Sequence, residues 1–412
     1  MPGADTDPRL ASYADLAIQV GLNLQPGQRL VVSAPIEAAP FVRLVAESAY
    51  KLGARYVDVV WGDDALRLLR FQHAPRDSFE EFPTWRADGM LSCAKRGDAF
   101  LSVHATDPQL LEDQDPELIS TAQRIEQIHR RPYLEYITRD KVNWCVVSLP
   151  IPSWANRVFP DLPEANRLTA LQDAIYAACR IDLADPVAAW RAHAAQLQTR
   201  CDLLNKARYS ALRITGAGTD LTIGLPGCHL WLGGGAVTEN GVTFVPNMPT
   251  EEVFTVPHRE GVEGTVSCSK PLNYGGTLIE DFSLTFEKGR AVSCRAAAGE
   301  KVLKSLIETD DGAARLGEVA LVPHSSPISR TGLLFYNTLF DENAASHVAL
   351  GRCYQGCLEG GDTMSDEEVA TQGGNDSMVH VDFMIGSEET SVDGLTADGG
   401  SEPVMRAGEW TD

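Results

Sequence analysis

The sequence predicts an α/β protein with an N-terminal α/β domain, built on a mainly parallel sheet, and a C-terminal mixed α+β domain. In the first half, short continuous apolar segments alternate with helical patterns, which indicates parallel strands covered on both faces. Beyond Tyr209 the pattern changes to alternation with glycine turns, which is typical of antiparallel strands. Because 412 residues exceed one ordinary core, we expect two domains, at residues 1–208 and 209–412.

The N-terminal elements follow from their apolar spacing. Pro26-Gly27 interrupts the first helical pattern, and Gly53 is placed to end the second helix. Short apolar runs between the helical patterns predict buried strands. We expect helices at 7–22, 41–52, 108–113, 117–128, 164–179 and 187–207, and strands at 29–34, 56–61, 99–103 and 144–149.

The C-terminal half mixes strands and helices. Alternating apolar residues predict antiparallel strands at 211–216 and 220–225. Residues 275–286 and 291–294 form a predicted hairpin around the turn 287–290. A helix is expected at 301–308 and a strand at 319–322, just after Glu318.

Charge and cysteine usage narrow the partners and the compartment. The formal net charge of −22 argues against nucleic acid and anionic membrane as partners. Residues 1–5 lack the basic and apolar regions of a signal peptide, and no apolar run reaches the length of a membrane span. The nine cysteines are scattered and form no CxxC pair. We therefore expect a cytoplasmic protein with reduced thiols.

Carboxylates and imidazoles recur inside short apolar segments between Asn247 and Asp382. Such acids cost several kcal/mol of desolvation unless a partner offsets it, and no matching lysines and arginines lie beside them. A divalent cation would offset that cost, and Glu, Asp and His are suitable ligands for zinc, cobalt or manganese. His380 and Asp382 flank Val381, so both would lie on one face of a strand.

These segments resemble the M29 family of metallo-aminopeptidases, the thermophilic aminopeptidase T group. The resemblance covers nearly the whole chain and is densest at 244–260, 272–286, 316–354 and 373–382. It implies an active-site tyrosine at Tyr354. It also implies metal ligands at Glu252, Glu318, Glu342, His347, His380 and Asp382.

The resemblance also implies a function. Residues 209–412 would form a metal-binding catalytic domain that holds two divalent ions: zinc, cobalt, manganese or magnesium. Glu318 would bridge the ions, and a metal-activated water would release N-terminal residues from short peptides. Tyr354 would donate a hydrogen bond to the tetrahedral intermediate. The family resemblance further implies a homodimer, and Glu251 is a candidate to anchor the substrate amine.

Other interpretations remain open for the same residues. Thr250 with the two following acids is also a helix start pattern, His347 alone fits a core histidine, and Tyr354 a core aromatic. The alternative function is a mononuclear non-haem iron ring-cleaving dioxygenase that uses His347, His380 and an acid. A third is a metal-binding protein without catalysis, although structural zinc would use cysteine. The metal content separates the first two: two ions for the hydrolase, one ferrous ion for the oxygenase.

Overall fold

The computed structural model describes residues 7–107, 109–274 and 277–411, and it divides the chain into two compact units. The first unit is Met1–Ala192 with Gly235–Pro249, and the second is His193–Gly234 with Thr250–Asp412. Helix α8 (Pro186–Ala207) runs across the division along the chain. The expected catalytic domain at 209–412 stays a prediction.

The first unit is a four-stranded parallel sheet with the strand order β2-β1-β3-β4, formed by β1 (Arg29–Pro35), β2 (Tyr56–Gly62), β3 (Ala99–His104) and β4 (Trp144–Ser148). All four strands lie where the apolar segments predict them. Two short strands, β8 (Ala236–Val237) and β9 (Thr243–Phe244), form a separate pair. The helices are α1 (Pro8–Leu16), α2 (Ala39–Lys51), α3 (Asp64–His73), α4 (Thr84–Lys95), α5 (Pro116–Thr138), α6 (Pro152–Val158) and α7 (Glu164–Ala178).

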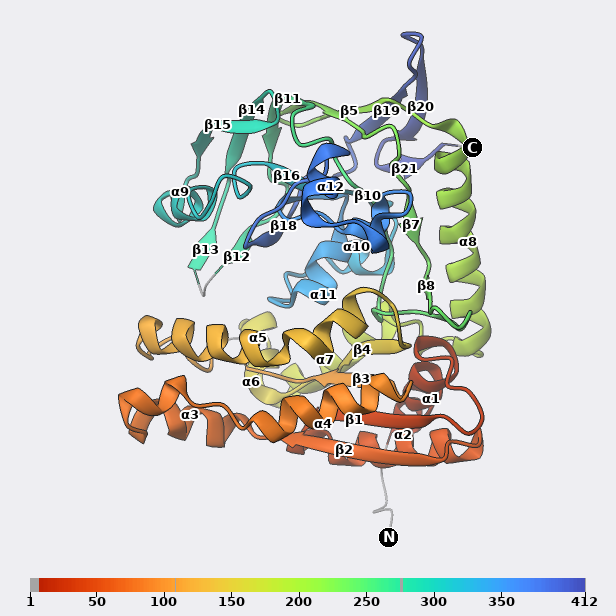
Figure 1. Cartoon of the computed structure of the whole chain (residues 1–412), viewed down its shortest axis with the longest axis vertical. Coiled ribbons are helices and arrows are strands. Elements are labelled where there is room, and N and C mark those ends of the chain that lie inside the picture. The colour runs from red at the N-terminus through yellow and green to blue at the C-terminus, as the bar shows by residue number, and fades with distance from the viewer. Residues whose placement is uncertain (1–6, 108, 275–276, 412) are drawn as a thin grey trace. The chain divides into compact units, whose positions relative to one another are not determined.

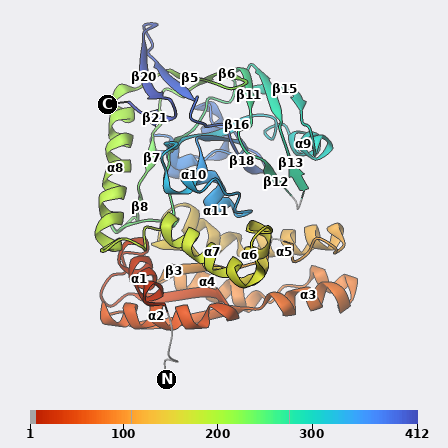
Figure 2. The ribbon, with the colours of Figure 1, turned by 180° about the vertical axis from the view of Figure 1, so that it is seen from behind.

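Helices cover both faces of this sheet, with α4 and α5 on one face and α1 and α2 on the other (Figures 1 and 2). Val32 and Leu101, from adjacent strands, are fully or almost fully buried between them. A parallel sheet buried on both faces explains why its strands read as continuous apolar runs.

Several helices differ from the sequence prediction. The predicted helix at 108–113 is wrong for residues 109–113, which form turns, while residue 108 lies outside the described residues. Helix α5 continues ten residues beyond the predicted end at residue 128, because Tyr133 packs against the Phe100 ring at 5.2 Å between centroids. The sequence prediction also missed α3, α4 and α6; no residue of α3 is fully buried, and α6 has only seven residues.

The second unit contains two large antiparallel sheets and the separate two-stranded pair β12-β13. The eight-stranded sheet has the order β15-β14-β11-β6-β5-β19-β20-β21 and the five-stranded sheet the order β18-β17-β16-β10-β7. The strands are β5 (Ala211–Gly216), β6 (Thr219–Gly224), β7 (Leu232–Gly233), β10 (Val253–Thr255), β11 (Val262–Ser267), β12 (Leu272–Tyr274), β13 (Thr277–Ile279), β14 (Ser283–Glu287), β15 (Arg290–Arg295), β16 (Leu316–Leu321), β17 (His347–Gly351), β18 (His380–Met384), β19 (Ser391–Leu395), β20 (Ser401–Arg406) and β21 (Glu409–Trp410). The helices are α9 (Glu300–Ile307), α10 (Pro327–Thr331), α11 (Thr338–Asp341) and α12 (Asp366–Thr371).

One hydrophobic core joins the two sheets. It contains Leu221 and Leu284 from the larger sheet and Val319 and Leu350 from the smaller one, all fully buried. The predicted hairpin is confirmed as β14 and β15, but residues 277–279 pair with β12 instead, and residues 275–276 lie outside the described part of the chain. Within the described residues, no helix combines the length and the apolar character needed to cross a bilayer.

A β-bulge interrupts the five-stranded sheet at Gly317. Leu316 pairs with Leu350, whereas Glu318 pairs with Ala349, so β16 carries one extra residue. Residues two apart on a regular strand share a face, and the bulge separates these two. Leu316 enters the hydrophobic core, while Glu318 lies on the opposite face with Ala349. Bulges of this kind often re-aim a side chain next to a functional site.

Only glycine fits at the bulge. A Cβ at Gly317 would lie 2.3 Å from the Gly351 carbonyl oxygen and 2.4 Å from that of Arg352. We expect Gly317→Ala to lower the free energy of unfolding by about 1–3 kcal/mol, as overpacking of a tight site does, measured by urea denaturation. The control is Gly227→Ala, where the added methyl meets open space. Equal effects of the two substitutions would contradict this account of the bulge.

Candidate metal centre

The side chains at the candidate centre lie on one face of the five-stranded sheet. In the register, Ala349 of the central strand β17 stands opposite both Glu318 of β16 and Asp382 of β18. His347 is two residues from Ala349 on the same strand, and Gly351 stands opposite His380. A methyl group and a hydrogen thus occupy the middle of this face, which leaves room between the larger polar side chains.

Glu252 enters from the neighbouring strand. It immediately precedes β10, in which Phe254 pairs with Ala320, and Ala320 in turn pairs with His347. Glu252 is two residues from Phe254, so its side chain is on the same face as the others. The predicted alternative, a helix beginning at Thr250, is wrong because the chain enters strand β10 there.

Two groups of candidate ligands share one residue. Glu252, Glu318 and His347 form one group, and Glu318, His380 and Asp382 form the other, each with ligand atoms within 4.8 Å of one another. Glu318 Oε1 lies 3.6 Å from His347 Nε2, and Glu318 Oε2 lies 3.5 Å from His380 Nε2. Each carboxylate oxygen of Glu318 therefore faces a different group.

Within each group, the histidine also lies close to a second carboxylate. His347 Nε2 lies 3.1 Å from Glu252 Oε2, and His380 Nε2 lies 3.3 Å from Asp382 Oδ1. The predicted placement of His380 and Asp382 on one strand face is confirmed, and Glu318 lies within its strand rather than before it.

Backbone carbonyls fix the orientation of both histidines. His347 Nδ1 lies 3.1 Å from the Ala345 carbonyl oxygen, and His380 Nδ1 lies 2.7 Å from that of Arg352. A carbonyl only accepts, so each Nδ1 carries a hydrogen, and each Nε2 is left on the side of the carboxylates. Metal-binding histidines are commonly held by such a hydrogen bond from the other ring nitrogen.

The buried acids fit a divalent cation. Glu252 Oε2, Glu318 Oε2 and Asp382 Oδ1 are buried and have no hydrogen-bond partner of good geometry in the described part of the chain. Among the described residues, the ion pairs of these carboxylates are with the two histidines, not with lysine or arginine. A buried acceptor without a partner costs about 1–3 kcal/mol, more when charged, and a metal ion would remove that cost.

The pKa shifts show the same shortage of positive charge. Burial raises the pKa of Glu318 to about 7. Burial, followed by repulsion from Glu252 and Asp382, raises the pKa of Glu342 well above its ordinary value. Burial alone would lower the pKa of His380, yet contact with Asp382 raises it to about 9. The raised pKa values of the two glutamates and of His380 all show that the cluster favours positive charge at its centre.

Glu342 and Tyr354 lie beside the two groups. Glu342 begins a short 3₁₀ turn (Glu342–Ala344) and belongs to neither 4.8 Å group, although its carboxylate interacts with those of Glu252 and Asp382. The Tyr354 ring contacts the His380 ring edge-on, with centroids 4.9 Å apart, and 52% of the residue is exposed. The prediction of a core aromatic at Tyr354 is therefore wrong.

The sequence prediction missed the support behind the site. Asn343 is fully buried, and its Oδ1 accepts a 2.7 Å hydrogen bond from the backbone N–H of Glu251. Its Nδ2 donates to the Leu339 carbonyl at 3.2 Å. Asn343 thus ties the turn of Glu342 to the segment that carries Glu252. Glu251 itself lies 3.5 Å from His193 Nε2 and belongs to neither ligand group.

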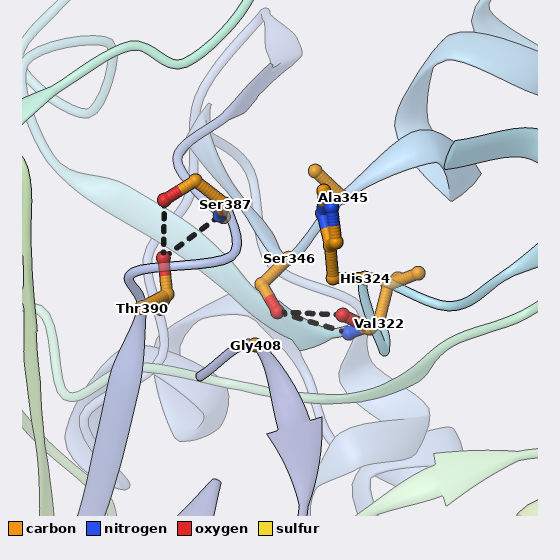
Figure 3. A pocket seen from close by; sticks show the side chains of 8 residues that line it. Val322, His324, Ala345, Ser346, Ser387, Thr390 and Gly408 are labelled. Atoms are coloured by element: carbon orange, nitrogen blue, oxygen red, sulfur yellow. Dashed lines mark hydrogen bonds between the residues drawn. The ribbon is translucent and has the colours of Figure 1, made fainter. Parts of the chain in front are cut away.

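A small hollow at the ends of β16 and β17 has a structural role. Figure 3 shows the Ser346 hydroxyl bonded to both the N–H and the C=O of Val322, at 3.0 and 3.1 Å. The Thr390 hydroxyl accepts from the Ser387 N–H at 2.8 Å. The hollow measures about 10 Å³, room for a single water at most. Its hydroxyls hold loop backbones together and are not arranged as a nucleophile.

Comparison with known proteins identifies the family of the chain. The family model described as thermophilic metalloprotease (M29) matches residues 6–410. Aminopeptidase 2 of Geobacillus stearothermophilus is 50% identical over 401 residues, 97% of each chain. Aminopeptidase T of Thermus thermophilus is 50% identical over 97% of this chain and 98% of its own. The solved structure of wild-type AmpT from Thermus thermophilus has a TM-score of 0.93 at 49% identity, covering 98% of this chain and 99% of that one.

A more distant likeness shows the fold alone. The structure of a 2,5-dihydroxypyridine dioxygenase from Pseudomonas putida is 12% identical, with a TM-score of 0.54, and covers 99% of this chain and 98% of its own. The fold is thus shared by a hydrolase family and an oxygenase and does not choose between them. The family model and the relatives at 50% identity do choose: the chain belongs to the M29 family of metallo-aminopeptidases.

Proposed function

We propose that the chain removes N-terminal residues from short peptides and that its centre holds two divalent ions. The observation that carries the proposal is the position of Glu318, which belongs to both ligand groups and faces each with a different oxygen. A carboxylate shared in this way is suited to bridge two ions, which lie about 3.5–4 Å apart in two-metal hydrolases. Several relatives carry the name aminopeptidase, which supports the peptide substrate.

The ligand assignment follows the two groups. Glu252 and His347 would hold one ion, His380 and Asp382 would hold the other, and Glu318 would be shared between them. Glu342 would be the sixth ligand, as the family resemblance implies, because it lines the same cavity as Asp382. Mixed imidazole and carboxylate ligands suit zinc, cobalt or manganese, and the excess of carboxylates also admits magnesium.

Divalent ions bound here supply Lewis acidity, which lowers the pKa of water from about 15.7 toward about 7 and polarises a carbonyl. The protein supplies orientation and charge. The half-exposed Tyr354, packed on His380, can donate a hydrogen bond to the oxyanion that forms at the scissile carbonyl. The buried acids provide the counter-charge that a substrate α-ammonium needs when it leaves water.

We also propose a cytoplasmic homodimer. No disulfide joins cysteines in the described part of the chain, which supports a reducing compartment. Light scattering on the purified protein should give twice the chain mass of 44.7 kDa. A single-chain mass at micromolar concentration would contradict the dimer.

The metal load tests the assignment of Glu318. Elemental analysis should find two divalent ions per chain, and chelation should abolish activity. Glu318→Gln removes the negative charge of the bridge, so it should retain at most one ion and lose activity on the order of 10²-fold or more, the scale of losing one electrostatic contact in an active site. The matched control, exposed Glu388→Gln, should keep both ions. Two ions and normal turnover in Glu318→Gln would show that another residue bridges.

Acetylation of the substrate amine tests the exopeptidase proposal. N-acetylation keeps the scissile bond and deletes the positive charge, so the buried acids would be left without their partner. Sites that bind a polar group reject analogues lacking it by about 10⁴–10⁵. Mass spectrometry should show free peptides shortened one residue at a time, while their acetylated forms persist. Comparable cleavage of interior bonds in acetylated peptides would instead make the enzyme an endopeptidase.

A further inference from the structure

A cavity of about 60 Å³ adjoins the candidate metal centre. Glu342 and Asp382 line it and also belong to the cluster of acids, so the cavity opens beside the proposed ligands. Leu272 of β12, Leu334 and Met384 of β18 form the apolar part of its wall, and Asn273, Asn337 and Thr338 form an uncharged polar part. Tyr336 lines it from the loop that precedes α11.

Tyr336 is held in an unfavourable backbone conformation. Its φ of 54° lies in the left-handed region, which residues other than glycine, asparagine and aspartate seldom adopt. Such strain persists only where the surrounding structure enforces it, and it clusters at active sites and ligand clamps. Because Tyr336 is strained at the wall of a cavity beside the candidate metal centre, we infer that its position has a functional role.

Asp341 enforces that conformation from both sides. Its Oδ1 accepts the Phe335 N–H at 2.6 Å, and its Oδ2 accepts the Asn337 N–H at 3.0 Å. The carboxylate thus grips the backbone immediately before and after Tyr336. Phe335 is further fixed by stacking on Phe340, with ring centroids 4.8 Å apart and planes at 21°. We call Asp341 with these two N–H groups the carboxylate clamp.

We propose that this cavity receives the side chain of the residue that is released, that Tyr336 sets its depth, and that Asp341 is the residue that positions Tyr336. The inference rests on the proposed aminopeptidase function. The α-amine and scissile carbonyl of the first residue must both reach the cluster, and its side chain branches from the carbon between them. A pocket lined by two acids of the cluster therefore adjoins the place where that carbon would lie.

Size and charge specify the side chain. A volume of about 60 Å³ holds about four water-sized groups, which matches a branched aliphatic side chain. The walls from Leu272, Leu334 and Met384 are apolar. The acids of the wall are already engaged, since Asp341 accepts from the backbone N–H groups around Tyr336 and Glu342 and Asp382 belong to the proposed metal centre. Uncharged aliphatic residues should be released faster than large aromatic ones.

The experiment uses two peptide series with the metal-loaded protein. In one series the first residue is alanine, leucine, phenylalanine or tryptophan; in the other the first residue is leucine and the second varies likewise. Tyr336→Ala should enlarge the pocket and raise the kcat/KM of phenylalanine relative to leucine at the first position about 10-fold, the scale of pocket discrimination between apolar side chains. The order at the second position should not change. Exposed Tyr56→Ala is the control.

Two further variants guard against misfolding and test the clamp. Tyr336→Gly should change selectivity as Tyr336→Ala does, with a Tm at or above that of Tyr336→Ala, because glycine accepts the left-handed backbone. Asp341→Asn replaces one acceptor by a donor facing an N–H, so it should release Tyr336 and shift selectivity in the same direction. The double variant with Tyr336→Ala and Asp341→Asn should change selectivity no further than Tyr336→Ala alone, since both changes act through one tyrosine.

The outcomes separate this inference from the function on which it rests. A wild-type protein without aminopeptidase activity defeats the proposed function. An active protein whose selectivity changes at the second position assigns the cavity to the other side of the scissile bond and overturns the inference. Unchanged selectivity at both positions in Tyr336→Ala and Tyr336→Gly also overturns it, and additive effects in the double variant remove the positioning role of Asp341.

Discussion

The second unit depends on one electrostatic constraint: several carboxylates are buried together on one face of a sheet whose other face forms the hydrophobic core. Glu318 and Asp382 project from strands whose alternate residues, such as Val319 and Phe383, are fully buried in that core. Neither acid can turn toward water without pulling apolar residues out of the core. The repulsion between the acids therefore has to be balanced in place, by the histidines and by cations.

The sheet supplies the geometry for that balance. Antiparallel register sets Glu318, Ala349 and Asp382 in one line across three strands, and the bulge at Gly317 allows an acid and a core leucine to lie two residues apart. The backbone carbonyls of Ala345 and Arg352 orient the two imidazoles. The register, the bulge and the carbonyl contacts are all features of the backbone rather than of long side chains, so they keep the centre rigid.

Much of this could be predicted from the sequence. The strands of the first unit read as apolar runs, and the spacing of His380 and Asp382 alone puts them on one strand face. The bulge could not be predicted, because pairing partners more than thirty residues apart determine it, as with Leu316 and Leu350. Nor does local sequence show that Asp341 grips the backbone around Tyr336, since a hydrogen bond from a carboxylate to main chain leaves no periodic pattern.

The absence of large side chains along the middle of the ligand face has a consequence for selectivity between ions. Ala349 and Gly351 offer no wall against which an ion of a given radius would fit or clash. Adjustment to a larger or smaller ion would fall on the torsion angles of the surrounding carboxylates, which are soft. A centre built in this way discriminates weakly by size, so its occupant would follow intrinsic affinity and the supply of each metal in the cell. The same ligand set could then function with different metals in cells that contain different amounts of each metal.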